Sequence, residues 1–437
     1  MNESYKSGSL SLTATVAMGT GVMIGAGIFA LTGQVAEYAG ALFPLAFLLA
    51  AVISGFSAYT YIKVTSKYPS AGGIAMILQK AYGKTMMTGA SALLMAFSMI
   101  INESLVARTF GTYTLQLFDV GNADVLVPVL AVGLIIAAFL INIAGNRLIG
   151  AVSKVTAVIK ILGILAFATA ALWAAGWTFK PASDGVINDP SATGFLAGVA
   201  LAILAYKGFT TITNSGGEVV NPHKNVGRAI IISLSICLVV YMLVAFGVGS
   251  SLTVDEIVRA KDYSLAEAAR PALGNYGVWF TVAIAIIATS SGLLASIFAV
   301  SRMLAMLTDM NIIPHRHFGM PGGIQKHTLV YTAVAAALLA AFFDLSRIAS
   351  LGAIFYLVMD IAIHWGVFRH LHEDVKASKP VLLIAMVLDL AALLAFLVIK
   401  GRADIDIVVI AVTSIAGIFA FERYYLSSRR NNKANAG

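Results

Sequence analysis

Twelve stretches of mostly apolar residues, each long enough to be a membrane-spanning helix, follow one another along the 437-residue chain. A helix crosses the hydrocarbon core of a bilayer in about 20 residues. Soluble domains contain about 25% charged residues, whereas this chain contains 11%, with 59% hydrophobic residues. Backbone polar groups in lipid must be satisfied within the segment, which favours helices. The sequence therefore predicts an all-α integral membrane protein of the cell (plasma) membrane, with a single transmembrane domain over residues 1–437.

The expected spans alternate with loops that carry most of the charge. They cover residues 11–36, 41–63, 86–110, 125–143, 151–175, 194–216, 227–250, 276–306, 327–344, 348–369, 380–399 and 404–424. Most of the 29 lysines and arginines fall on the side of the membrane that also holds both chain ends, if the spans number twelve. Because basic loops remain in the cytoplasm, this bias predicts that both termini are cytoplasmic.

Glycines interrupt the first span. The stretch Gly19–Gly33 reads GTGVMIGAGIFALTG, and each glycine costs a helix about 1 kcal/mol relative to alanine. At membrane depth, backbone groups released from a helix are tolerated only against protein or a water-filled cavity. We therefore expect Ile24–Ile28 to unwind and to offer its amides to an anionic group. The alternative is close helix packing through small residues such as Gly21 and Gly25.

The sixth span is interrupted in a similar way. Residues 194–217 begin as a smooth apolar run, and Tyr206-Lys207-Gly208-Phe209 then introduces a charge and a glycine near mid-depth. Corresponding breaks in two halves of a chain are typical of inverted-repeat transporters with a site at the bilayer midplane. A channel or a membrane enzyme is the less favoured alternative, because the sequence shows no filter motif and no cluster of nucleophiles or metal ligands. We accordingly expect no catalytic residues, metal or cofactor.

Four short motifs resemble those of a known transporter family. In chain order they are Gly21–Phe29 (GVMIGAGIF), Lys67–Gly73 (KYPSAGG), Gly217–Asn225 (GEVVNPHKN) followed by Arg228-Ala229-Ile230, and Ser301-Arg302 followed by Asp309 and Ile313-Pro314. Together with Phe209, they are similar to the helix-one, helix-two, helix-six and helix-eight signatures of the amino acid–polyamine–organocation (APC) transporters, of the proton-coupled amino acid permease type. The last four spans match that family only in number and length.

The resemblance implies the leucine-transporter fold, in which helices one and six are discontinuous. Residues 1–180 would form the first five-helix repeat, residues 190–370 the inverted second repeat, and residues 375–437 helices eleven and twelve with a cytoplasmic tail. The amides of the first break would bind the carboxylate of an amino acid, and carbonyls near the second break its amino group, as the dipoles of half-helices favour. The residues concerned are Ile24, Gly25, Ala26, Gly27 and Ile28 in the first helix and Ala205, Tyr206 and Gly208 in the sixth.

Two intramembrane groups are candidates for proton coupling. Lys160 lies inside the fifth span, where an ionisable side chain is expensive and functional by default. It resembles the lysine that takes the place of a cation in proton-coupled, sodium-independent members of the family, which implies contacts with carbonyls of helix one. The alternative is a permanent structural tie between helices five and one. Glu103, in the third span, is the second candidate, as a buried carboxylate that relays protons.

Lys207 departs from the family pattern, which usually has a neutral or acidic residue before Gly-Phe. One hypothesis is that it pairs with a second carboxylate of an acidic or dicarboxylic substrate. The other is an ion pair with a protein carboxylate, Glu103 or Asp360. Phe209 is either an aromatic gate over the substrate or a packing residue. Asp360 and His364 lie one turn apart, either as a proton relay or at the cytoplasmic rim.

These patterns and the resemblance predict a secondary active transporter rather than an enzyme. Its partners would be an amino acid or a related small zwitterion, protons and the lipid bilayer, and no nucleic acid. Alternating access with proton coupling and without sodium is the favoured mechanism. An amino acid/polyamine exchanger and a carrier of acidic substrates that uses Lys207 are the alternatives.

Overall fold

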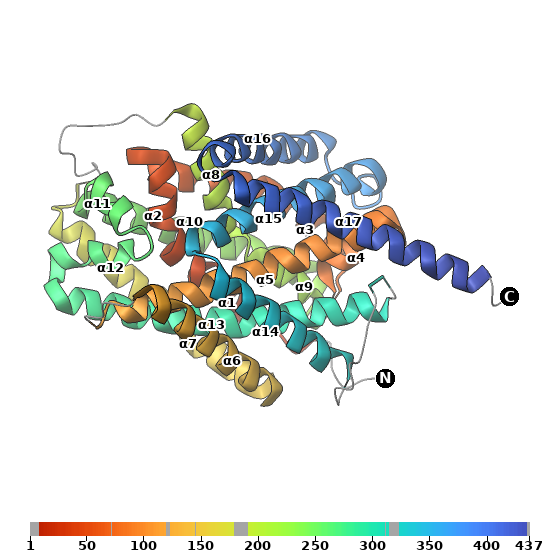
Figure 1. Ribbon diagram of the computed structural model, residues 1–437, viewed down its shortest axis with the longest axis horizontal. Coiled ribbons are helices and arrows are strands. Elements are labelled where there is room, and N and C mark those ends of the chain that lie inside the picture. The colour runs from red at the N-terminus through yellow and green to blue at the C-terminus, as the bar shows by residue number, and fades with distance from the viewer. Residues whose placement is uncertain are drawn as a thin grey trace.

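The computed structural model describes residues 8–70, 72–118, 123–144, 146–178, 191–310, 312–313 and 323–434. Over these residues the chain forms an elongated bundle of helices (Figure 1). Eleven of the described helices are long and apolar enough to cross a membrane, and Leu12–Gly25 is a shorter apolar helix. An all-helical integral membrane protein is therefore confirmed. The number of twelve spans stays a prediction, because Ile28–Lys67 is one continuous helical stretch by these criteria.

The first two expected spans are nevertheless divided by a sharp change of direction. The chain begins with α1 (Leu12–Val22), a π-helical turn η1 (Met23–Gly27) and α2 (Ile28–Ala39). A 3-10 turn, η2 (Gly40–Leu42), then leads into α3 (Phe43–Lys67). Gly40 has φ 52° and ψ −139°, a backbone conformation that residues with a side chain rarely adopt.

The remaining elements follow the expected order. They are α4 (Gly73–Tyr82), α5 (Met86–Leu115), α6 (Ala123–Ala144), α7 (Asn146–Ala174), α8 (Ala192–Tyr206), α9 (Phe209–Asn214), η3 (Gly216–Glu218), α10 (Pro222–Ser251), α11 (Val254–Arg259), α12 (Ser264–Ala268), α13 (Arg270–Asp309), α14 (Ile324–Phe342), α15 (Leu345–Gly366), η4 (Val367–Leu371), α16 (Lys379–Ala403) and α17 (Ile405–Ala434). Proline stands in the first turn of α3, α10, α13 and α16, where its missing N–H costs nothing.

The first and sixth helices form the centre of the bundle. Helix α2 packs against α8, and α1 packs against α9, so the two interrupted helices lie side by side in opposite directions. Helices α3, α5, α10 and α13 surround them. Almost all of α5 and of the α8–α9 segment is buried inside the protein, whereas most of α6 and α17 faces outward. The outward faces are apolar, as a lipid-facing surface requires.

Two short helices cover one end of the bundle. Helices α11 and α12 lie at the left end in Figure 1, against α2. A capping box starts α11, since the Thr253 hydroxyl accepts from the Glu256 amide while Glu256 accepts from the Thr253 amide. This satisfies two N–H groups that the helix itself leaves free. The hydrogen bond from Thr253 also lowers the pKa of Glu256.

Candidate functional site at two interrupted helices

The first break is a π-helical turn, and the prediction that Ile24–Ile28 unwinds is wrong for this structure. Met23–Gly27 forms the turn, and the residues at both of its ends keep helical dihedral angles. A π turn admits one extra residue, which shifts the hydrogen-bond register and frees carbonyls from the α-helical ladder, and such turns are frequent at functional sites. The expected amides of Ile24, Gly25, Ala26, Gly27 and Ile28 thus lie in a widened helix rather than in an extended segment.

Side chains from helices distant in the sequence donate hydrogen bonds to the carbonyls around this turn. Lys160 of α7 donates its ammonium to the Gly21 carbonyl at 2.8 Å and to the Ser291 hydroxyl at 3.0 Å. The Tyr241 hydroxyl of α10 lies 2.5 Å from the Met23 carbonyl and 3.1 Å from the Ala205 carbonyl. Tyr241 therefore bridges the carbonyls of both interrupted helices. The expected contact of Lys160 with helix one is present, through Gly21.

The sixth helix breaks where the sequence predicts. Helix α8 ends at Tyr206 and α9 begins at Phe209, so Lys207 and Gly208 lie between them. The Thr210 and Thr211 amides reach back only three residues, to the carbonyls of Lys207 and Gly208, at 2.9 and 3.1 Å. This tighter spacing interrupts the α-helix for one turn.

Glycines bring the two breaks into backbone contact. A Cβ on Gly208 would lie 2.9 Å from the Met23 nitrogen, and a Cβ on Gly27 would lie 2.9 Å from the Ala205 Cα. Gly25 meets Gly292 of α13, where an added Cβ would lie 3.3 Å from the Gly292 Cα. Gly25 therefore takes part in close helix packing, as the alternative explanation of these glycines expects, and the helix it meets is α13. Glycine at these positions serves both the interruption and the packing.

Lys207 forms neither of the expected ion pairs. Its ammonium donates to the Ser98 carbonyl at 3.1 Å and lies 5.9 Å from the centre of the Tyr356 ring. Glu103 instead accepts from the Ser296 hydroxyl at 3.2 Å, and Asp360 accepts from α3. The prediction of a direct ion pair to Glu103 or Asp360 is wrong. Among the described residues, the hydrogen-bond acceptors of this buried ammonium are neutral.

Both ends of the site are covered. Toward α11 and α12, the Gln34 amide donates to Asp262 at 2.6 Å, and Lys261 pairs with Glu37 at 2.8 Å. Toward the other end, the backbone of Leu10 pairs with that of residues 218–220, through N···O distances of 2.9 Å. A buried ion pair between Arg302 and Glu218 lies on the same side.

The candidate residues with described side chains are accordingly all buried between these two ends. A groove of about 440 Å³ lies outside them, between α1, α7 and α10, with an almost wholly apolar lining. Phe209 packs edge-on against Tyr61, with ring centres 5.2 Å apart, which is a packing contact and leaves its role as a gate a prediction.

Sequence reasoning missed two residues, Tyr241 at the breaks and Asp389 beside α15. Tyr241 reaches the first helix from far along the chain, and no local pattern distinguishes it from other buried tyrosines. Asp389 could have been found, because it is a lone carboxylate inside the apolar run 380–399. Asp360 and His364, expected either as a proton relay or at the cytoplasmic rim, are both completely buried beside Asp389.

Comparison with known protein families identifies the family of this chain. The model of the family described as "Amino acid permease" matches residues 10–421. The chain belongs to the amino acid permease family. The resemblance to APC transporters is thereby confirmed, and an amino acid permease is a multi-pass membrane transporter rather than, as a rule, an enzyme.

Relatives of this permease align with it over most of both chains. It is 28% identical to the inner membrane transport protein YbaT of Escherichia coli over 392 residues, which covers 89% of each chain. It is also 28% identical to the protein MJ0609 of Methanocaldococcus jannaschii over 435 residues, or 98% of each chain. The branched-chain amino acid permease BcaP of Lactococcus lactis is 25% identical over 385 residues, which covers 81% of this permease and 80% of BcaP.

Proposed function

We propose that this permease is a proton-coupled, sodium-independent secondary transporter of an amino acid, which works by alternating access with both termini in the cytoplasm. The observation that carries the proposal is the Lys160 ammonium, buried in the protein and bonded to the Gly21 carbonyl and the Ser291 hydroxyl. A bound cation at this point would hold the first helix and α13, which carries Ser291, together in the same way. Transfer of the Lys160 proton would remove that charge and weaken the tie.

The substrate in this proposal is a zwitterion held at the meeting point of the two breaks. Its carboxylate would meet the amides of residues 24–28, and its amino group the carbonyls near Ala205, Tyr206 and Gly208. Tyr241 now bonds the Met23 and Ala205 carbonyls, so binding of the amino group would compete with the Tyr241 hydroxyl. The name of the relative BcaP, a branched-chain amino acid permease, supports an amino acid substrate.

Uptake into proteoliposomes tests the coupling. With an inward proton gradient and no sodium, we expect the protein to accumulate labelled amino acid, and we expect Lys160→Met to lower this accumulation at least tenfold. Lys84→Met is the matched control, because Lys84 is exposed, and it should behave as the parent protein. A sodium requirement, or accumulation by Lys160→Met at the parental level, would overturn the proposal. Unfolding temperatures of the three proteins establish that each is folded.

Acidic amino acids are a second candidate substrate class. The specific observation is that the buried Lys207 ammonium has neutral hydrogen-bond acceptors and no ion pair among the described residues, so a substrate carboxylate would find a free positive charge there. The test is uptake of labelled glutamate and of a labelled neutral amino acid by Lys207→Ala. Loss of glutamate uptake with retained neutral uptake supports pairing with the substrate, whereas an unchanged preference ends that idea.

Proton-driven uptake and exchange can be separated in the same vesicles. If the protein is an amino acid/polyamine exchanger, labelled substrate will enter only when a counter-substrate is loaded inside. A thermal-stability screen against amino acids, polyamines and carboxylates would identify the ligand beforehand, because a ligand that binds the folded state raises its stability by mass action.

A further inference from the structure

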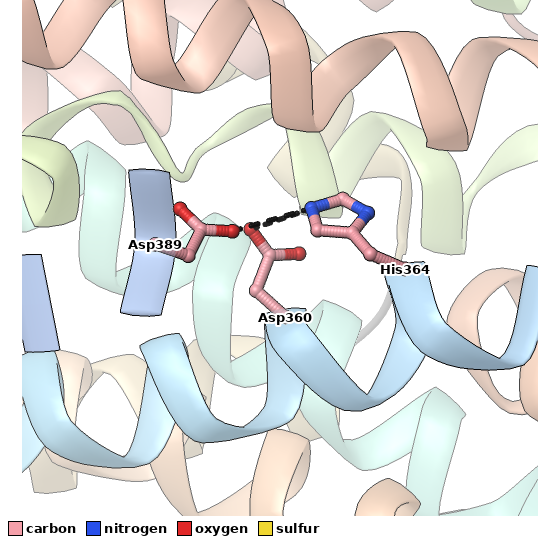
Figure 2. Close-up of side chains that lie close together, drawn as sticks. All are labelled: Asp360, His364 and Asp389. Atoms are coloured by element: carbon pink, nitrogen blue, oxygen red, sulfur yellow. Dashed lines mark ion pairs between the residues drawn. The ribbon is translucent and has the colours of Figure 1, made fainter. Parts of the chain in front are cut away.

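Three titratable side chains meet inside the bundle, away from the site described above. Asp360 and His364 lie one turn apart on α15, and Asp389 comes from α16 (Figure 2). The His364 Nε2 atom is 3.6 Å from an Asp360 oxygen and 3.3 Å from an Asp389 oxygen. All three side chains are 0% exposed.

Hydrogen bonding distinguishes the two carboxylates. Both oxygens of Asp360 accept from α3, one from the Ser57 hydroxyl at 2.6 Å and the other from the Tyr61 hydroxyl at 2.5 Å. Neither oxygen of Asp389 has a hydrogen-bond partner among the described residues, and neither ring nitrogen of His364 has one. The contacts between His364 and the two carboxylates are thus ion-pair contacts without hydrogen bonds, and a buried polar group that makes no hydrogen bond is costly.

The part of the chain that the structure describes places no basic side chain in an ion pair with the two carboxylates of the cluster, apart from His364 itself. The titratable groups that face it are the phenols of Tyr61 on α3 and Tyr356 on α15. The nearest lysine of the α8–α9 segment, Lys207, lies over the Tyr356 ring and bonds Ser98, and Glu103 of α5 bonds Ser296. Among the described residues no lysine or arginine makes an ion pair with Asp360 or Asp389.

Two ionised carboxylates and a neutral imidazole would therefore leave a charge of −2 in the interior of a membrane protein. A buried, uncompensated charge is expensive, and such groups take up protons or bind a metal instead. Two protons or one divalent cation would make the cluster neutral. The hydrogen bonds decide between these solutions.

Protons fit the observed contacts better than a metal. A histidine that binds a metal through one nitrogen almost always donates its other N–H to a partner, and no described residue hydrogen-bonds the second nitrogen of His364. Asp360, which accepts two O–H groups, is stabilised as the carboxylate. Asp389 accepts no hydrogen bond from the described residues and is stabilised as the protonated acid. We propose that Asp360, His364 and Asp389 form a proton-binding site, in which Asp389 gains and loses the proton.

Tyr61 connects this site to the break in the sixth helix. Its hydroxyl donates to Asp360, its ring lies 6.3 Å from that of His364, and the same ring packs edge-on against Phe209 at 5.2 Å. When the cluster loses its proton, the added negative charge strengthens the hydrogen bond from the Tyr61 hydroxyl to Asp360. The link from protonation to transport rests on the proposed function, whereas proton binding itself does not.

Infrared difference spectroscopy of the purified full-length protein tests proton binding. A protonated carboxylic acid gives a carbonyl-stretch band that disappears as the pH is raised. We expect one such band to be absent from Asp389→Asn and to remain in Glu422→Gln, a control that replaces another buried carboxyl group. Asp389→Asn is close to isosteric, and its unfolding temperature establishes that it folds. A spectrum unchanged by Asp389→Asn would overturn the proposal.

Metal analysis of the same samples tests the alternative. The proposal expects no stoichiometric metal after purification with added Zn²⁺ followed by desalting. One Zn²⁺ per chain in the parent protein, lost in Asp389→Asn, would replace the proton site with a metal site. His364→Gln, which removes the imidazole, should shift the pH at which the Asp389 band disappears, and an unshifted transition would exclude His364 from the site.

Proteoliposome uptake over a range of pH tests the link to transport. We expect Asp389→Asn to flatten the pH profile of uptake while Lys160→Met abolishes gradient-driven accumulation, so the two variants fail in different ways. If the Asp389 band is present and uptake proves independent of protons, the proposed coupling fails and the proton-binding site stands. An Asp389→Asn profile identical to that of the parent would overturn the link through Tyr61.

Discussion

Single side chains hold the site together by donating hydrogen bonds to carbonyls beside the two helix breaks. Lys160 donates a hydrogen bond to the Gly21 carbonyl, and the Tyr241 hydroxyl lies within hydrogen-bond distance of the Met23 and Ala205 carbonyls. Both side chains come from helices outside the first and sixth, so the surrounding helices, rather than the two interrupted ones, fix the distance between the breaks. The stability of the closed site therefore depends on a few donors whose loss would leave buried acceptors unpaired.

The Tyr241→Phe variant measures this dependence. Removing the hydroxyl takes away the side-chain donor of the Met23 and Ala205 carbonyls, and the loss of a hydrogen bond of this kind costs about 0.5–1.5 kcal/mol. We expect a lower unfolding temperature in purified protein and weaker substrate selectivity in uptake. Tyr276→Phe is the control, since Tyr276 is 78% exposed and its hydroxyl can bond water. Equal unfolding temperatures for the two variants would contradict this role of Tyr241.

At the scale of elements, glycine explains how two helices can be interrupted and still pack tightly. The backbones of the π turn and of the Lys207–Gly208 break touch where Gly208 meets Met23. Gly25 meets Gly292 of α13 in the same way. Because lipid supplies no hydrophobic driving force between helices, such close backbone contacts are a main source of association in membranes.

The Gly208→Ala variant tests the contact between the breaks. The added Cβ would lie 2.9 Å from the Met23 nitrogen and 3.0 Å from the Gly19 carbonyl oxygen, and backbone atoms cannot move aside as a side chain does. Overpacking of this kind costs about 1–3 kcal/mol, so we expect a lower unfolding temperature and slower uptake. At Gly55, where an added Cβ meets no atom within 4 Å, alanine should be neutral or slightly stabilising. A Gly208→Ala protein as stable as Gly55→Ala would show that the two backbones separate readily.

At the scale of the whole molecule, two separate sets of contacts close the two ends of the site. One end is covered by Lys261 and Asp262, in the loop between α11 and α12, where they contact Glu37 and Gln34. The other end is covered by the pairing of Leu10 with residues 218–220 and by the Arg302–Glu218 ion pair. Alternating access would require each cover to open in turn, so their stabilities set the balance between the two open states.

Asp262 makes the stability of the end closed by Lys261 and Asp262 depend on pH. Burial raises the pKa of Asp262 above its ordinary value, partly offset by Lys261 and by the hydrogen bond from Gln34. A carboxyl group with a raised pKa in the folded state destabilises that state when ionised, and this cost disappears as the pH falls. Asp262→Asn should therefore raise the unfolding temperature at neutral and alkaline pH, with a gain that shrinks toward acid pH. Asp255→Asn, an exposed control on α11, should show no such dependence, and a pH-independent gain in Asp262→Asn would contradict the explanation.

The sequence by itself determined the features that depend on local composition. Long apolar runs require helices in a membrane, and the glycines of Gly19–Gly33 and of Gly208 placed the two interruptions correctly, because helix propensity is a local property. The lone charge Lys160 was identified for the same reason. Even so, the sequence did not give the form of the first break, which is a π turn, since local propensity does not determine the hydrogen-bond register.

Only the tertiary structure decided which polar groups meet. Lys207 bonds Ser98 instead of a carboxylate, Tyr241 reaches Met23, and Asp389 joins Asp360. In a chain that is apolar on almost every helix face, periodicity does not indicate which faces are inside, so partners distant in the sequence cannot be paired from it. Packing makes that choice, because a buried polar group must find its partner wherever the helices cross.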